Sequence, residues 1–262
     1  MKKVTSVLFI ACFISAVSLA QSKSKQDSLE REAAKTEIYE PVPKSVTPGI
    51  INSGAPSDAI QLYNGKDLSH WHTKNGAPAG WKIEKDGALT IVKGSGNLIT
   101  NQSFGDCQLH LEWREPSVIL DNGQLRGNSG VYFMSRYELQ IMDSYNNPTY
   151  VNGQAGSIYK QHIPLVNASK KPGEWQSYDV VFIAPKFYSD GKIQTPARIT
   201  VFQNGVLIQN NVAIKGLSQW IGQPKYVAHG EKEPLFLQDH GLDGGQPISY
   251  RNIWIRELGS NN

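Results

Sequence analysis

Short runs of alternating apolar and polar residues fill the chain from residue 58 to residue 258. A period of two is typical of strands that bury one face, whereas a helix repeats its apolar positions every three to four residues. Lys85-Asp86-Gly87 and Asn204-Gly205 each separate two such runs, and both predict a hairpin turn. Further strands are expected at 109–113, 131–134, 137–141, 157–159, 178–183, 235–238 and 253–255.

Many short strands joined by Gly, Asn and Asp turns predict an all-β domain. No long segment of this region carries the apolar stripe of a helix. A run of roughly 200 residues suits one domain, and we expect a two-sheet antiparallel β-sandwich of the jelly-roll type. Such a fold commonly leaves one sheet concave, which provides a groove for an extended ligand.

Two segments of different character precede this domain. Lys2 and Lys3 come before an apolar run that closes with small residues at Ala20, so we expect a signal peptide over residues 1–20. The run is too short to span a membrane. A lipoprotein acylated at Cys12 is the alternative. Residues 21–55 are polar and then rich in Pro, and we expect a flexible linker there. The protein is then exported, to the periplasm or beyond.

Charge and cysteine content add little. The net charge falls from +3 to +1 when Lys2 and Lys3 leave with the signal peptide. A balance this close to neutral gives no reason to expect nucleic acid or anionic lipid as a partner. Only Cys107 survives processing, and no Cys or His spacing typical of zinc surrounds it, so we expect a buried, inert thiol.

The segment 137–143 concentrates polar groups among apolar ones. If Leu139 and Ile141 face the core, Glu138 and Gln140 project side by side from the opposite, open face of the strand. Asp143 has the other parity and joins them only if a β-bulge inserts one residue after Gln140. This cluster indicates a site on a sugar-handling sandwich. The alternative is a solvated strand face with ordinary surface acids.

Several motifs carry a resemblance to a known family. They are Leu62-Tyr63-Asn64-Gly65-Lys66-Asp67-Leu68, Gly80-Trp81-Lys82, Gly127-Asn128-Ser129-Gly130-Val131-Tyr132, Tyr137-Glu138-Leu139-Gln140-Ile141-Met142-Asp143, Ala155-Gly156-Ser157-Ile158-Tyr159-Lys160, Leu237-Gln238-Asp239-His240-Gly241 and Tyr250-Arg251-Asn252-Ile253. In this order they resemble the 3-keto-disaccharide hydrolase domain family, formerly domain of unknown function 1080. The resemblance implies a concanavalin A-like jelly roll over residues 56–262 and an exported carbohydrate-active protein.

The substrate class implied by this resemblance defines the chemistry to look for. A sugar oxidised at C3 has an acidic hydrogen at C2, and its removal gives an enediolate that can expel the C1 substituent. The reaction needs a base, a hydrogen-bond donor at the ketone oxygen and an acid for the leaving group. We assign Glu138 as the base and His240 as the acid or the carbonyl clamp. Lys160 or Arg251 could steady the enediolate charge.

Other residues complete the candidate site. The Asn128 amide could hold a sugar hydroxyl, although a residue between two glycines is also a common turn former. Trp220, in a long irregular insert, is the best candidate for an exposed aromatic platform. Lys160 and His162 are candidate substrate contacts, and a solvated loop is their alternative.

A divalent cation is an alternative way to polarise the ketone. Glu138, Asp143 and His240 could hold it, with Gln140 contributing an oxygen. None of these three candidate ligands stands in a tight His-x-His or Asp-x-Asp spacing, so no cofactor is assigned to the site.

Two other functions compete with the elimination. Laminarinase-type β-glucanases use Glu-x-Asp-x-x-Glu on a bulged strand, but here Gln140 and Asp143 replace the second and third acids. A neutral amide and a shorter acid do not suit a retaining mechanism, which needs carboxyls about 5 Å apart. A non-catalytic carbohydrate-binding module is the other alternative, and it predicts aromatic residues along the groove without converging acids.

Overall fold

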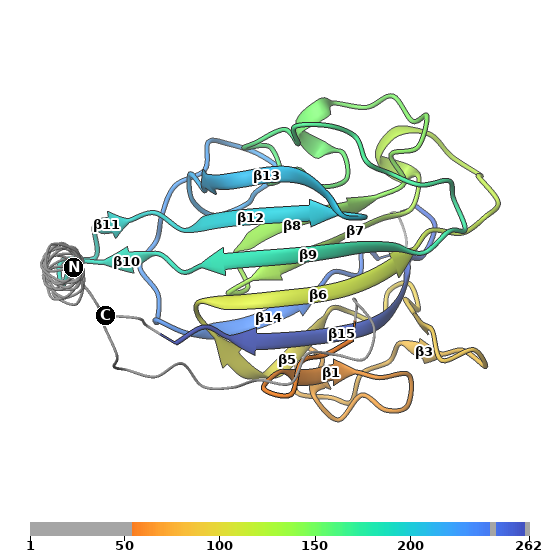
Figure 1. Cartoon of the computed structure of the whole chain (residues 1–262), viewed down its shortest axis with the longest axis horizontal. Helices are drawn as coiled ribbons and strands as arrows, with labels where there is room; N and C mark the ends of the chain where they lie inside the picture. The colour runs from red at the N-terminus through yellow and green to blue at the C-terminus, as the bar shows by residue number, and fades with distance from the viewer. Residues whose placement is uncertain (1–53, 242–244, 260–262) are drawn as a thin grey trace, which may run out of the picture. The chain divides into compact units, whose positions relative to one another are not determined.

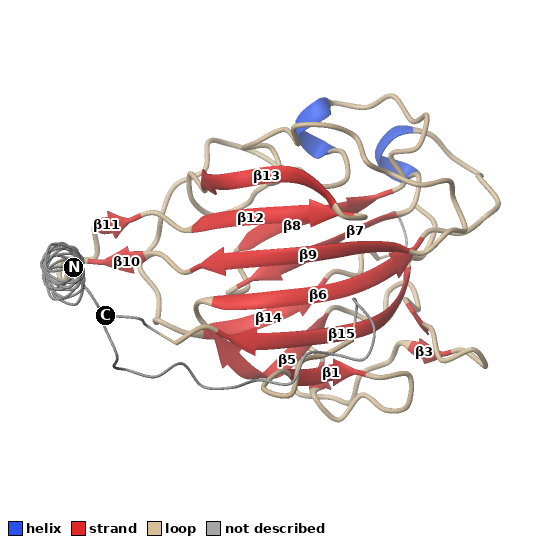
Figure 2. Cartoon of the chain, in the orientation of Figure 1, coloured by secondary structure: helices blue, strands red, loops and turns tan. Residues whose placement is uncertain are grey.

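The computed structural model describes residues 54–241 and 245–259, and two antiparallel sheets account for nearly all of its regular structure (Figures 1 and 2). The larger sheet has the order β13-β12-β9-β6-β15-β4-β3, and β1 also pairs with β15. Its strands are β1 (Ile60–Tyr63), β3 (Lys82–Ile83), β4 (Leu89–Thr90), β6 (Cys107–Arg114), β9 (Gln176–Ile183), β12 (Arg198–Gln203), β13 (Val206–Ala213) and β15 (Ser249–Glu257).

The smaller sheet has the order β2-β5-β14-β7-β8. Its strands are β2 (Trp71–His72), β5 (Leu98–Phe104), β7 (Asn128–Phe133), β8 (Tyr137–Met142) and β14 (Glu233–Leu237). A separate hairpin joins β10 (Lys186–Phe187) to β11 (Ile193–Thr195), and two single-turn 3-10 helices are η1 (Gly123–Leu125) and η2 (Val151–Gly153). In Figure 1, β6, β9, β12 and β15 form a layer in front of the strands of the smaller sheet.

The core lies between the two sheets. Leu109 and Leu111 of β6 are fully buried there, together with Leu139 of β8. Phe133 of β7 stacks on Phe182 of β9 across the sandwich, with ring centroids 4.8 Å apart. Alternate residues of the two sheets therefore supply the core, as the period of two predicts. The predicted all-β sandwich is confirmed.

Both predicted hairpins are present. Asn204 and Gly205 have φ of 52° and 80°, the left-handed pair that a two-residue hairpin turn requires. Gly87 has φ of 80° in the β3–β4 turn, where the Glu84 amide donates to the Ala88 carbonyl. Cys107 is buried as expected, and desolvation raises the pKa of its thiol.

The sequence patterns miss several strands. The predictions do not include β1, β2, β5, β10 or β11, and the predicted strand at 157–159 forms only isolated bridges, from Ile158 to Leu139 and to His162. The signal peptide expected at 1–20 lies outside the described residues, as does the linker up to residue 53. Within 54–241 and 245–259, no helix is long and apolar enough to span a membrane.

Candidate active site

The β7–β8 hairpin builds the candidate site on the outer face of the smaller sheet. Its register pairs Tyr132 with Glu138 and Gly130 with Gln140. Leu139 belongs to the core, so Glu138 and Gln140 point away from it, as the alternation predicts.

Glu138 is not on an open strand face, which corrects the expectation from the sequence. Only 3% of its surface is exposed, and all six residues of β8 are buried. The physical reason is that two other segments lie along the free edge of this strand. The Glu138 amide donates to Ser218 Oγ (3.0 Å), and the Tyr159 amide donates to the Glu138 carbonyl (3.2 Å). Glu138 is therefore not an ordinary surface acid.

Among the described residues, the Glu138 carboxyl has one hydrogen-bond partner. The Tyr132 hydroxyl donates to its Oε2 at 2.7 Å, and Gln238 Nε2 donates to that hydroxyl at 3.3 Å. Burial raises the pKa of Glu138 to about 8, even though the bond from Tyr132 acts in the opposite direction. A carboxyl with this pKa can both take and return a proton near neutral pH.

Gly130 makes room for this arrangement. A Cβ at this position would lie 2.6 Å from Glu138 Oε1 and 3.0 Å from Tyr132 Cε2. Any larger residue would displace the carboxyl or the phenol, so the glycine is a requirement of the site geometry.

Two amides extend the site towards His240. Gln140 Nε2 donates to Asn128 Oδ1 at 2.9 Å, and Asn128 Nδ2 donates to the Gln124 carbonyl at 2.8 Å. Asn128 and His240 line the same small cavity of about 10 Å³. The ring of His240 is partly desolvated there, which lowers its pKa against the opposing effect of Asp239.

Glu138 and His240 are not joined directly. No hydrogen bond or ion pair links the two groups among the described residues, and Glu138 is not among the residues that line the cavity of His240. Asp239 holds the turn at His240, since its carboxylate accepts from the amides of Gly96 and Gly241.

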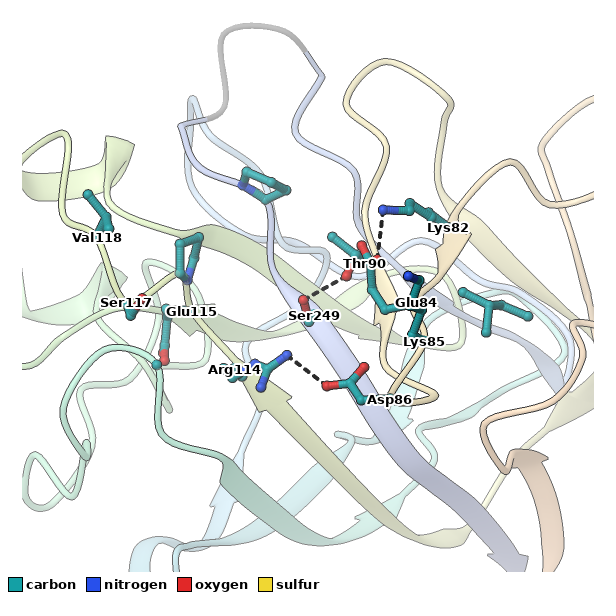
Figure 3. A pocket seen from close by; sticks show the side chains of 14 residues that line it. Lys82, Glu84, Lys85, Asp86, Thr90, Arg114, Glu115, Ser117, Val118 and Ser249 are labelled. Carbon is teal, nitrogen blue, oxygen red and sulfur yellow. Dashed lines mark hydrogen bonds and ion pairs between the residues drawn. The ribbon is translucent and has the colours of Figure 1, made fainter.

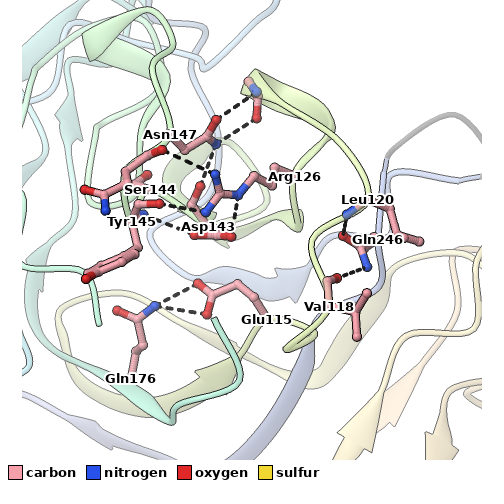
Figure 4. Close-up of polar contacts among 12 residues, drawn as sticks. Glu115, Val118, Leu120, Arg126, Asp143, Ser144, Tyr145, Asn147, Gln176 and Gln246 are labelled. Carbon is pink, nitrogen blue, oxygen red and sulfur yellow. Dashed lines mark hydrogen bonds and ion pairs between the residues drawn. The ribbon is translucent and has the colours of Figure 1, made fainter. Parts of the chain in front are cut away.

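Asp143 does not join Glu138. The β7–β8 register runs without a bulge to Met142, so Asp143 keeps the other parity. Its Oδ2 accepts from Arg126 Nε at 2.6 Å, and both side chains are buried (Figure 4). The described part of the chain holds no group of three or more His, Cys, Asp or Glu side chains suited to a metal. The proposed cation site of Glu138, Asp143 and His240 is therefore not formed.

Lys160 and Trp220 lie together near the edge of β8. Lys160 Nζ donates to the Trp220 carbonyl at 2.7 Å and lies 5.8 Å from the ring centroid of Tyr159, whose amide bonds to Glu138. Trp220 is 72% exposed, as a platform requires. His162 instead donates to the Ala213 carbonyl at 2.8 Å.

Arg251 lies on the other sheet, apart from Glu138. Its Nε and Nη2 bond to Glu112 Oε2 at 2.7 and 2.6 Å, and its guanidinium stacks on Trp175 at 4.1 Å. The ion pair joins β15 to β6 on the outer face of the larger sheet. Arg251 therefore cannot steady an intermediate beside Glu138.

Sequence reasoning did not assign a role to Tyr132, Gln238 or Tyr159. Tyr132 could have been found, because a short turn between residues 133 and 137 sets 132 opposite 138. Gln238 and Tyr159 come from distant segments, and no local pattern reports their approach.

Comparisons with known proteins relate the chain to carbohydrate-active domains. A profile of the 3-keto-alpha-glucoside-1,2-lyase-like domain family matches residues 58–256. A candidate glycosyl hydrolase from Parabacteroides distasonis ATCC 8503, solved at 2.13 Å, is 52% identical, with a TM-score of 0.82 over 86% of this chain and 96% of that one. A second one from the same organism, solved at 1.70 Å, is 21% identical and shares the fold, with a TM-score of 0.58 over 82% and 100% of the two chains. No curated protein sequence matches this chain significantly.

Proposed function

This chain belongs to the 3-keto-alpha-glucoside-1,2-lyase-like domain family, a glycosyl hydrolase-like group of carbohydrate-active domains, and from that premise we propose that it cleaves the glycosidic bond of 3-keto-glycosides by elimination. One observation carries the proposal. Glu138, a buried carboxyl with a pKa of about 8, is hydrogen-bonded to Tyr132 on the outer face of the smaller sheet.

The reaction follows from the acidity of the substrate. Glu138 takes the C2 hydrogen as a proton, and the electron pair of that bond forms the enediolate with the C3 carbonyl. The enediolate then breaks the bond between C1 and the leaving oxygen. The proton returns from Glu138 to the leaving oxygen through the Tyr132 hydroxyl, so that no co-reactant is needed until water adds to the product.

Neighbouring residues have supporting roles. His240 has a lowered pKa and is largely neutral at pH 7, so its N–H suits hydrogen bonding to the C3 oxygen. Burial and the nearby Glu138 raise the pKa of Tyr132, which keeps its phenol neutral and able to relay a proton. The amides of Gln140 and Asn128 suit sugar hydroxyls.

Glucanase-like double displacement is less well supported. That mechanism needs a second carboxyl beside the first, about 5 Å away in retaining enzymes. Gln140 occupies the next outward position on β8, and the Asp143 carboxylate is paired with Arg126.

A substrate comparison tests the proposal. The purified domain is incubated with a 3-keto-glucoside and with the corresponding plain glucoside, each with and without a chelator. We expect cleavage of the keto substrate alone. Cleavage of the plain glucoside would favour double displacement, binding without turnover would favour a carbohydrate-binding module, and loss on chelation would favour metal assistance.

Export is part of the same proposal. It rests on the sequence pattern of residues 1–20, where two lysines precede an apolar run. Mass spectrometry of the mature protein should find an N-terminus at Gln21. An acylated Cys12 would instead identify a lipoprotein.

A further inference from the structure

A groove of about 750 Å³ lies on the larger sheet, and Glu138 is not among its lining residues (Figure 3). Its floor crosses three adjacent strands, because Ser249 of β15 pairs with Thr90 of β4 on one side and with Arg114 of β6 on the other. The volume falls within the range of roughly 300–1,000 Å³ that is typical of small-molecule sites.

Both walls of the groove are held in place. The β3–β4 hairpin forms one wall, and its turn is fixed where the Ala88 amide donates to Asp86 Oδ1. The other wall includes Val118, and Gln246 clamps this segment by donating to the Val118 carbonyl (2.7 Å) and accepting from the Leu120 amide (3.1 Å), as Figure 4 shows. The groove is therefore preformed and does not require a ligand to order it.

Four of the six charged side chains along the groove form two ion pairs, and the other two are one base, Lys85, and one acid, Glu115, which accepts from Gln176 Nε2 at 2.8 Å. Lys82 Nζ lies 2.7 Å from Glu84 Oε2, and Arg114 Nη2 lies 3.4 Å from Asp86 Oδ2. An anion would meet the carboxylates of Glu84 and Asp86, and a cation would meet the lysine and the arginine. Neither kind of charged ligand is favoured by such an arrangement.

The floor is polar as well. Thr90 Oγ1 and Ser249 Oγ are hydrogen-bonded to each other at 2.8 Å, and a purely apolar ligand would leave their remaining donor and acceptor capacity unsatisfied. Val118, which is mostly exposed, and Pro247 supply small apolar surfaces beside them. A ligand that matches all of these groups is neutral, rich in hydroxyls and apolar on one face.

We propose that this groove is a second carbohydrate-binding site, which takes a neutral pyranose ring. Asp86 accepts from one ring hydroxyl and Arg114 donates to its neighbour, while Val118 and Pro247 contact the carbon face of the ring. Pro247 also lines the cavity of His240, so a longer glycan bound here extends towards the candidate active site. The inference holds whether or not Glu138 is the catalytic base.

Asp86→Asn is the first test. The variant keeps an acceptor for the Ala88 amide but removes the carboxylate charge that strengthens the bond to a hydroxyl. Asp190→Asn is the matched control, because Asp190 holds the β10–β11 turn in the same way, accepting from the Lys192 amide. We expect Asp86→Asn to weaken binding of cellobiose or maltose, followed by NMR titration, by about tenfold, and Asp190→Asn to leave it unchanged.

A floor variant and an active-site variant complete the experiment. Thr90→Val combined with Ser249→Ala replaces both partners of one hydrogen bond, so the fold should tolerate it while the ligand loses two polar contacts. Glu138→Gln should bind both disaccharides as the wild type does. Unchanged affinity in both groove variants would overturn the proposal, as would the absence of any disaccharide-induced shift in the wild type. Loss of binding in Glu138→Gln would overturn it too, because the sugar would then occupy the other sheet.

Discussion

The environment of Glu138 converts a common residue into one suited to proton transfer. Replacing it with Gln keeps the size of the side chain and its bond from Tyr132 but removes the base. We expect kcat/KM for a 3-keto-glucoside to fall by about 10²–10⁴ in Glu138→Gln. Because the base must be deprotonated, wild-type kcat/KM should rise with pH towards a plateau above the pKa of about 8.

Initial rates of keto-sugar cleavage between pH 6 and about pH 9.5 check this prediction. Circular dichroism of the variant is the control for folding. A wild-type profile that is level across this range, or a variant of normal activity, would remove Glu138 from the mechanism.

Asp143 gives a contrasting case at the same scale. Its carboxylate pairs with the buried Arg126, whose Nη2 also donates to the Tyr145 carbonyl at 2.6 Å. Removing one member of a buried pair leaves the other charge uncompensated, so Asp143→Ala should lower the free energy of unfolding by about 3–5 kcal/mol. Urea unfolding measures this, with Asp190→Asn as a control that changes little, because it loses only the exposed pair with Lys192 and keeps an acceptor for the Lys192 amide.

Catalysis offers a second readout for Asp143. Folded Asp143→Ala should retain the kcat of the wild type at low temperature, because the carboxylate does not reach the Glu138 site. A loss of kcat with unchanged stability would contradict this assignment.

At the scale of the strand, β7 contributes to the site through Gly130, which has no side chain. A Cβ at Gly130 would lie 2.6 Å from Glu138 Oε1, whereas a Cβ at Gly205 meets nothing within 4 Å. Gly130→Ala should therefore lower kcat by about tenfold or more through a shift of the reacting groups. Gly205→Ala should cost only about 1 kcal/mol of stability, for its positive φ, and leave kcat unchanged. Steady-state kinetics and thermal unfolding of both variants separate the two effects.

Elements with local signals could be predicted from the sequence. Asn204-Gly205 specifies its own turn, and the alternation around Leu139 places Glu138 on the correct face. The predictions that were wrong concern features that depend on residues far away in the sequence. The burial of Glu138 comes from Tyr159 and Ser218, which approach through loops, and alternation contains no information about loops.

Arg251 is a second residue whose position depends on long-range contacts that the local sequence does not report. Its motif was assigned to the site, but β15 pairs with β6 and shifts register between residues 251 and 254. Pairing order decides which sheet a motif joins, and it is set by long-range contacts. A single sequence therefore placed the core well and the partners of the site poorly.

For the whole molecule, buried titratable groups predict that stability and activity respond oppositely to pH. Burial raises the pKa of Glu138 to about 8 and that of Glu115 to about 7, above the ordinary value of 4.5. A carboxyl with a raised pKa binds a proton on folding. Its contribution to stability is complete below pH 4.5 and is lost as the pH rises through the folded pKa.

Two further titratable groups narrow the pH range in which the fold is most stable. Burial alone would lower the pKa of His110, but Asp179 and Glu112 outweigh it and raise the pKa to about 9. The contribution of His110 to stability is therefore complete below pH 6.5 and is lost as the pH rises towards 9. Burial opposes ionisation of Glu112, yet hydrogen bonds from His110, Asn252 and Arg251 lower its pKa to about 2. The contribution of Glu112 to stability is therefore lost on acidification below pH 4.5. The melting temperature should therefore peak near pH 5–6 and fall by several degrees by about pH 8.5.

Differential scanning fluorimetry across this pH range tests the prediction. The Glu138→Gln variant shows how much of the change in melting temperature is due to Glu138. The variant carries no ionisable group at position 138, so its melting temperature should exceed that of the wild type at pH 8.5 and match it more closely at pH 5. If the two proteins lose stability in parallel, Glu138 does not titrate in this range, and the proposed base loses its physical support. If the difference grows with pH as expected, the ionised carboxylate that the reaction needs is a form that destabilises the fold, which is the usual relation between stability and activity in a buried catalytic site.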